Sequence, residues 1–109
     1  MVHSAEKIIL IYITAPTESE ARRLLKALIK KRIVACGNIS EIESIYRWKG
    51  KITNSGEWAI IAKTLDPNFE KAKKEIEKIH SYEIPCIIKI PAVADEKYLN
   101  WIKEELKLS

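Results

Sequence analysis

The stretch that decides the fold is residues 44–58, SIYRWKGKITNSGEW. Strand-forming side chains stand on both sides of Lys49-Gly50, and a two-residue turn containing glycine is a strong short-range signal for a β-hairpin. With this turn Trp48 lies opposite Lys51, so that residues whose numbers add up to 99 face each other. The sequence therefore predicts a long antiparallel hairpin. Its strands span residues 33–48 and 52–65.

Side chains alternate along a strand, so the turn also assigns the hairpin residues to the two faces of the sheet. One face carries apolar residues suited to packing under helices, among them Ile39 and Trp58. The other carries the polar and charged set Cys36, Asn38, Ser40, Glu57 and Lys63. We expect Cys36 directly opposite Lys63, where an ammonium group favours the thiolate and suits Cys36 to bind a soft metal. A β-bulge at residues 54–56 would exchange the two faces beyond it.

Two charges on this polar face need partners or water. Glu57 and Lys63 are six residues apart on one strand, about 20 Å, so they cannot pair with each other. Either both are solvated on an uncovered sheet face, or the face lines a cleft between subunits.

The remaining elements follow from apolar periodicity and helix-start signals. Thr17 and Glu20 form a capping box at the start of the first helix, and Asp66-Pro67 begins the second. The order β-α-β-β-α-β with an extra C-terminal helix predicts an α+β, ferredoxin-like fold, with one antiparallel sheet and both main helices on one face, in a single domain over 1–109. The other predicted elements are a strand at 8–13, helices at 17–31 and 66–80, a strand at 84–90 and a helix from Asp95.

Composition excludes several classes of protein. The chain has 109 residues, with 19 Lys and Arg against 15 Asp and Glu, and the basic residues alternate with Glu along the helices as on a solvated surface, not as in a nucleic-acid-binding stripe. It shows neither a membrane span nor a signal segment, so we expect a cytoplasmic protein. Cys36 and Cys86 belong to no CxxC pair, which indicates reduced thiols. The charge-rich surface would suit a thermostable protein.

Several side chains outside the hairpin have ordinary structural explanations. We expect His80 to end the second helix, where it favours the helix dipole, and Cys86 to be a small core residue on its strand. Three Trp and four Tyr are a heavy aromatic load for so small a core. A ring of identical subunits would bury part of this surface and pair the exposed strand edges.

Six segments resemble, in order, motifs of the CutA divalent-cation tolerance family, and together they span nearly the whole chain. They are TAP at 14–16, ACGNI at 35–39, SIYRWKG at 44–50, Glu57 with KT at 63–64, HSYEIP at 80–85 and YLNW at 98–101. The resemblance implies a ferredoxin-like subunit in a tight homotrimer, similar to the nitrogen-regulatory PII signal proteins, without established catalytic activity.

The family name also implies tolerance of copper and other divalent metals. Copper-tolerance members carry a Cys before TAP and two adjacent His before a Pro-Tyr pair. This chain has Ile13, Ile79 and Ser81 at the Cys, first His and Pro positions, and keeps only His80. A glycine, Gly37, stands where a small apolar or β-branched residue is usual.

The sequence thus predicts a non-enzymatic homotrimeric binding or signalling protein, with no certain cofactor and a possible divalent cation such as copper. The expected ligand-binding cleft comprises Asn38, Glu57, Lys63, Tyr82 and Glu83. The expected metal ligands are His80 and Cys36. Two alternatives remain: a PII-like sensor of a small anionic metabolite, and a small ferredoxin-like hydrolase, although no Gly-rich phosphate loop is present. No nucleic acid or membrane partner is expected.

Overall fold

A computed structural model describes residues 7–107 and confirms the predicted order of elements. The four strands form one antiparallel sheet in the order β2-β3-β1-β4. The elements are β1 (Lys7–Ala15), α1 (Glu18–Lys30), β2 (Cys36–Trp48), β3 (Lys51–Thr64), a 3-10 turn (Asp66–Asn68), α2 (Phe69–Ile79), β4 (Ile87–Val93) and α3 (Glu96–Leu106).

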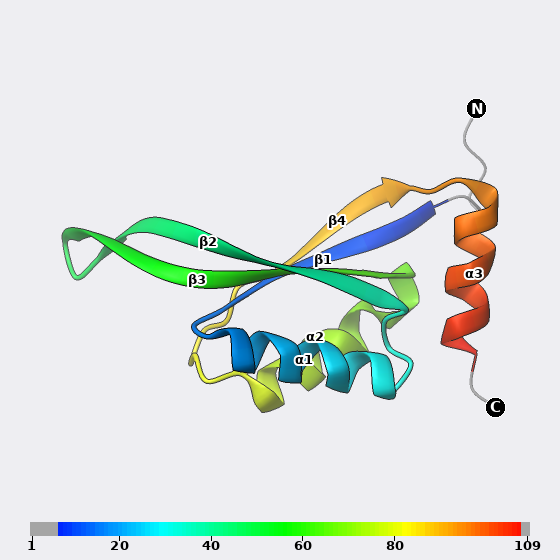
Figure 1. The fold of residues 1–109 in the computed structure, drawn as a ribbon, viewed down its shortest axis with the longest axis horizontal. Helices are drawn as coiled ribbons and strands as arrows, with labels where there is room; N and C mark the ends of the chain where they lie inside the picture. The colour runs from blue at the N-terminus through cyan, green and yellow to red at the C-terminus, as the bar shows by residue number, and fades with distance from the viewer. Residues whose placement is uncertain (1–6, 108–109) are drawn as a thin grey trace.

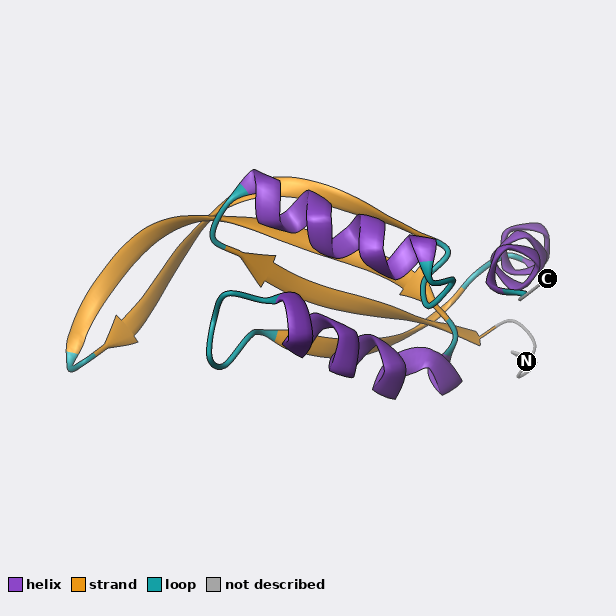
Figure 2. Cartoon of the chain, turned by 90° about the horizontal axis from the view of Figure 1, so that it is seen from below, coloured by secondary structure: helices purple, strands orange, loops and turns teal. Residues whose placement is uncertain are grey.

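Two layers make up the body of the molecule. Helices α1 and α2 lie side by side against one face of the sheet, while α3 lies at the end of the sheet away from the hairpin turn (Figures 1 and 2). The core between the layers is apolar and closed. Its fully buried members include Ile11 and Ile13 of β1, Leu24 and Leu28 of α1, Ile60 of β3 and Ile76 of α2.

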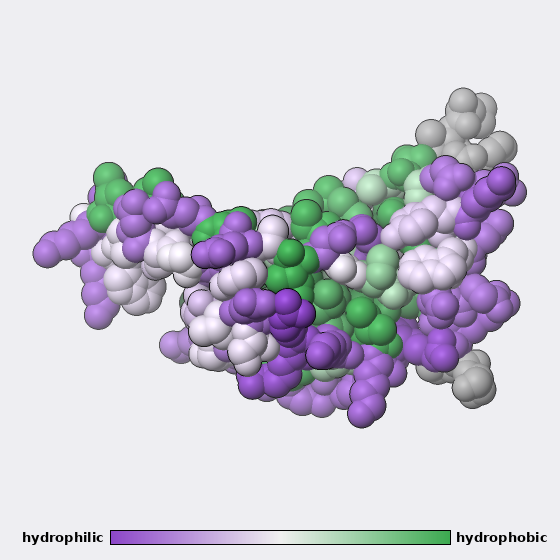
Figure 3. Space-filling model, in the orientation of Figure 1, coloured by the Kyte–Doolittle hydropathy of each residue, from purple (hydrophilic) through white to green (hydrophobic). Residues whose placement is uncertain are grey.

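The opposite face of the sheet, which we call the open face, is covered by residues 7–107 only at one end, where α3 packs on Ile8 through Leu99 and Ile102. Over the rest of it large apolar side chains are exposed, and Figure 3 shows hydrophobic residues gathered along the sheet. The exposed fraction is 37% for Ile61, 49% for Ile88 and 40% for Ile90.

The hairpin has the predicted register throughout. Pairing runs from Cys36 opposite Lys63 to Trp48 opposite Lys51, without a bulge at residues 54–56. Lys49 and Gly50 have φ values of 50° and 80°, the positive values that a type I′ turn requires. The outer part of the hairpin, the arm, projects beyond the helices (Figure 1). It exposes Ile45, Trp48 and Ile52.

Two strand boundaries were predicted wrongly. The last strand was expected at 84–90 but spans Ile87–Val93, with Pro91 inside it. An edge strand tolerates a residue without an N–H group. Ile87, not Ile88, therefore packs on the core, and Cys86 lies just before the strand instead of within the core. Strand β2 begins at Cys36 instead of residue 33, because the N–H groups of Ile33 and Val34 still bond to the carbonyl oxygen of Leu28 in α1.

The helix starts agree only in part with the sequence. Thr17 caps α1 as predicted, since its hydroxyl accepts from the N–H of Glu20 at 3.1 Å. The Glu20 carboxylate does not complete the capping box; it bonds Ser81 instead. Asp66 makes no capping bond either, and its carboxylate pairs with Lys89 at 2.9 Å.

Candidate functional site

The residues predicted to line a ligand cleft form two separate pairs within one chain. Tyr82 donates to a carboxylate oxygen of Glu57 at 2.8 Å, and the Lys63 ammonium donates to the side-chain oxygen of Asn38 at 2.5 Å. The two pairs lie about 20 Å apart along β3. Glu83 is exposed and makes no hydrogen bond or ion pair with any residue of 7–107. One end of the open face is thus anionic and the other cationic.

The anionic end is held in a fixed position. Glu57 is only 9% exposed, although it lies on the open face, because the loop between α2 and β4 places Tyr82 over it. Burial, and next the hydrogen bond to Glu57, raise the pKa of the Tyr82 hydroxyl. The hydroxyl is therefore protonated at neutral pH and donates to the carboxylate. Tyr82 engages one oxygen of Glu57, and the other has no partner within the described residues.

The cationic end includes a thiol. Cys36 lies opposite Lys63, as predicted, and its sulfur is 3.1 Å from the hydroxyl of Tyr98 on α3. Tyr98 stacks on Trp101 with ring centroids 5.7 Å apart. The bond to Cys36, followed by burial, raises the pKa of Tyr98 to about 12. A protonated hydroxyl on an aromatic pair therefore flanks the thiol.

His80 is buried, and both of its ring nitrogens are engaged. One nitrogen, Nε2, lies 2.6 Å from the carbonyl oxygen of Thr14, and Nδ1 accepts from the N–H of Tyr82 at 3.0 Å. Because a carbonyl oxygen can only accept, this pattern assigns the hydrogen to Nε2, and Nδ1, which accepts from Tyr82, carries none. The 3.3 Å separation between Nδ1 and Glu20 is then not an ion pair. To bind a metal, His80 must give up one of these two bonds.

The predicted metal ligands do not converge in a single chain. His80 contacts Thr14, which pairs with Ala59, and Ala59 is four residues from the partner of Cys36 on β3, about 13 Å. No group of three or more His, Cys, Asp or Glu side chains within residues 7–107 is placed to hold a metal ion. Residues 7–107 of one chain therefore do not form a metal site by themselves.

Sequence reasoning missed two residues of these clusters, Glu20 and Tyr98. The sequence places Glu20 only in the helix cap, and Tyr98 only in the YLNW motif of the last helix. The sequence does contain one indication that Glu20 is buried. It lies beside Ala21 and Leu24, which places its carboxylate at the edge of the buried face of the helix. Nothing in the local pattern identifies the distant partners of either residue.

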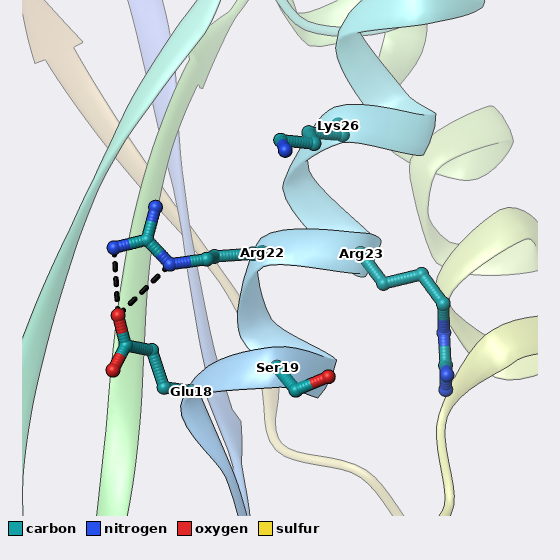
Figure 4. Close-up of a pocket in the computed structure, with 5 residues that line it drawn as sticks. All are labelled: Glu18, Ser19, Arg22, Arg23 and Lys26. Atoms are coloured by element: carbon teal, nitrogen blue, oxygen red, sulfur yellow. Dashed lines mark hydrogen bonds and ion pairs between the residues drawn. The ribbon is translucent and has the colours of Figure 1, made fainter.

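A separate hollow lies on the outward side of α1 (Figure 4). Arg22 points toward Glu18 and binds it through two nitrogens at 2.9 and 2.6 Å, while Arg23 points to the other side of the helix. Ser19 and Lys26 complete the lining. These charges belong to the solvated helix surface that the sequence predicted, away from the open face.

The chain was then compared with known proteins. A family model described as CutA1 divalent ion tolerance protein matches residues 9–105. The divalent-cation tolerance protein CutA of Archaeoglobus fulgidus is 43% identical over 98 residues, 89% of this chain and 96% of that protein. Its counterpart from Thermotoga maritima is 41% identical over 101 residues, 91% and 99% of the two chains.

Solved structures agree with the sequence comparison. The periplasmic divalent cation tolerance protein CutA from Archaeoglobus fulgidus has a TM-score of 0.89 at 40% identity, over 92% of this chain and 99% of that one. That protein is described as periplasmic, so a cytoplasmic location for this chain stays a prediction. No helix within residues 7–107 is both long and apolar enough to span a membrane.

These relatives are named for cation tolerance, not for an enzymatic reaction or a metabolite, so neither alternative raised by the sequence is favoured. The motif resemblance, the fold and the extent of the match all agree. The chain belongs to the CutA1 divalent ion tolerance protein family.

Proposed function

We propose that the protein is a non-enzymatic homotrimeric binding protein that acts in the cytoplasmic response to divalent metal cations, copper among them. The names of its relatives support the cation response. The observation that carries the proposal is the open face, which is apolar yet uncovered within the described chain. The two cysteines are free thiols, which fits a reducing compartment.

A single chain leaves this face incomplete. Burying an isoleucine or leucine side chain contributes about 1.5–3 kcal/mol, and the open face forgoes part of this at Ile61, Ile88 and Ile90. The arm likewise leaves the apolar side chains of Trp48 and Ile52 exposed to solvent. The sheet also ends in two edge strands, β2 and β4, whose outward N–H and C=O groups are available for pairing. A closed threefold ring with the open faces inward would satisfy both needs.

The ring also offers a way to build the ligand site. We place the ligand between copies, where the Glu57–Tyr82 end of one chain and the Lys63–Asn38 end of a neighbour can face the same cleft, with Glu83 at its rim. Because residues 7–107 of one chain supply no cluster of three metal ligands, a cation bound there would take protein ligands from more than one copy. Carboxylate oxygens suit hard divalent cations, and a thiolate such as that of Cys36 suits copper.

His80 can bind a metal at this site only if one of its present hydrogen bonds breaks. Its ring is buried and bonded on both sides, so it joins a metal site only if the bond to Thr14 or to Tyr82 opens. Copper binding at His80 therefore predicts a local rearrangement of the loop after α2, whereas binding at Glu57 and Cys36 does not.

Calorimetry on the purified trimer tests the proposal, with Cu²⁺, Zn²⁺ and Mn²⁺ titrated separately and inorganic phosphate as an anion control. We expect Glu57→Gln to weaken binding of at least one cation about tenfold, because a ligating charge is lost. The matched control Glu77→Gln, an exposed carboxylate on the helical side, should change nothing. Absence of cation binding, or equal effects of the two variants, would contradict the proposed site; binding of phosphate alone would favour an anion sensor.

A further inference from the structure

Glu20 is a buried carboxylate that the proposed ligand site does not use. It lies in the first turn of α1, on the helical side of the sheet, and is 7% exposed. Removing a carboxylate from water costs several kcal/mol unless hydrogen bonds replace the lost solvent. The hydrogen-bond partners of the Glu20 carboxylate therefore indicate why it is buried.

Those partners lie in the loop that follows α2. Oxygen Oε2 of Glu20 accepts from both the N–H and the hydroxyl of Ser81, each at 3.0 Å. Two bonds from one residue fix the backbone and the side chain of Ser81 together. Thr17 alone caps α1, and the Glu20 carboxylate bonds to the loop instead of to the end of its own helix.

The next residue of the loop is the one that reaches the open face. The N–H of Tyr82 donates to Nδ1 of His80, and the Tyr82 hydroxyl donates to Glu57. The His80 ring is held in turn by the carbonyl oxygen of Thr14 on β1. The start of the loop is thus bonded to α1, β1 and β3, whereas Ile84, two residues beyond Tyr82, is 87% exposed.

We propose that Glu20 is a positioning residue for the open-face cleft: from the helical side it fixes Ser81, and thereby holds Tyr82 where its hydroxyl binds and orients Glu57. The Glu20 carboxylate touches neither Glu57 nor the open face, so its effect reaches Tyr82 through Ser81, which it bonds, and through His80, whose Nδ1 lies 3.3 Å away. The positioning of Tyr82 follows from the contacts of the chain alone. Its consequence for ligand binding rests on the proposed function.

The chain offers a matched control for this role. Glu18 lies in the same first turn of α1, but its carboxylate is exposed and binds only Arg22 within residues 7–107. Glu18→Ala removes the same charge from the same helix end without touching the loop. Glu20→Gln removes the charge but keeps an oxygen that can accept from Ser81.

Amide hydrogen exchange and the ¹³C shift of the Tyr82 ring carbon that bears the hydroxyl, followed by nuclear magnetic resonance on the intact protein, test the positioning. We expect Glu20→Ala to speed exchange at Ser81 and Tyr82 about tenfold and to shift the ring carbon toward its value in a Glu57→Gln variant. Glu20→Gln should restore both readouts, and Glu18→Ala should leave both unchanged. Strand amides of β4 serve as an internal reference for global stability.

If the ¹³C chemical shift of the Tyr82 ring carbon is the same in Glu20→Ala and wild type, the proposal is overturned. It is also overturned if Glu20→Ala speeds amide exchange in β4 as much as at Ser81 and Tyr82. If Glu20→Ala does not fold, Ser81→Ala decides, because it removes one of the two bonds and should give a smaller ring shift in the same direction; no shift would overturn the proposal.

Titration with Mn²⁺ then separates this inference from the proposed function. If both hold, Glu20→Ala weakens Mn²⁺ binding about as much as Tyr82→Phe does, and Glu20→Gln restores it. A wild-type protein that binds none of Mn²⁺, Zn²⁺ and Cu²⁺, while Glu20→Ala still changes the chemical shift of the Tyr82 ring carbon, would contradict the cation site and support the positioning role.

Discussion

The two faces of the sheet are built from neighbouring residues of the same strands, yet they have opposite environments. On the helical face Ile60 is fully buried, together with Ile11 and Ile13. On the open face the adjacent Ile61 is 37% exposed, and Ile88 on the edge strand is 49% exposed. Both sides carry large apolar side chains, but residues 7–107 cover only one side fully.

The difference indicates that the core and the proposed assembly surface are separate parts of the molecule. The helical face is completed by α1 and α2 of the same chain, so it determines whether the chain folds. The open face lacks such a cover, and the residues that distinguish it chemically, Glu57 and Lys63, lie among its exposed apolar side chains. Changes to the two faces should therefore have different consequences.

The largest expected effect comes from replacing the adjacent Ile60 and Ile61 with alanine, one at a time. Ile60→Ala should lower the free energy of unfolding by about 2–5 kcal/mol, because it leaves a cavity in a closed core. Ile61→Ala should instead weaken association, which appears as dissociation at a higher protein concentration. Denaturant unfolding at two protein concentrations measures both. Equal, concentration-independent losses would remove the distinction between the faces.

A smaller effect is expected at Gly37, where α1 approaches β2 closely. A Cβ there would lie 2.7 Å from Cδ1 of Leu25 and 3.1 Å from the carbonyl oxygen of Ile61. Gly37→Ala should therefore cost about 1–3 kcal/mol by overpacking the helical face. Gly56 of the arm has open space around it within one chain, so Gly56→Ala should be neutral or slightly stabilising in thermal unfolding. A tolerated Gly37→Ala would show that the helix can move away.

The smallest expected effect concerns the outer surface of the helical layer. Lys31 binds both carboxylate oxygens of Glu75 at 2.8 and 2.9 Å, and this bond lowers the pKa of Glu75 below its ordinary 4.5. A lowered pKa means that the stabilisation is present at neutral pH and disappears as the pH falls through the pKa of the folded state. The difference in melting temperature between wild type and Glu75→Gln should be small, should shrink as the pH falls below 4.5, and should also shrink in high salt.

An exposed control residue checks the origin of that pH dependence. Glu77, on the same helix, makes no ion pair with residues 7–107, so Glu77→Gln should follow the wild-type curve at every pH. A Glu75→Gln curve that stays parallel to wild type down to pH 3 would mean that the pair contributes nothing.

The hairpin could be predicted residue by residue because one local signal, the Lys49-Gly50 turn, determines every pair along it. The last strand lacked such a signal. In IPCIIKIP, residues 84–91, apolar side chains occupy both alternating positions, so the face of each depends on where pairing with β1 begins. Only the tertiary structure decides that Ile87 packs inward and Ile88 does not.

The site was predictable to a similar degree. Alternation placed Glu57 and Lys63 on the open face and Cys36 opposite Lys63, as observed. It did not reveal that Tyr82, 25 positions away, would cover Glu57, or that Glu20 would bond Ser81 from the other layer. These contacts join elements that no local pattern relates. The trimer and its ligand are still predictions.

Sedimentation equilibrium of the full chain at micromolar and lower concentration tests most directly whether copies of the chain cover the open face. We predict a mass of three chains, about 37.5 kDa from 12.5 kDa each, and a shift toward single chains in Ile61→Asp. A wild-type protein that sediments as one chain throughout, with the same melting temperature at every concentration, would contradict the account.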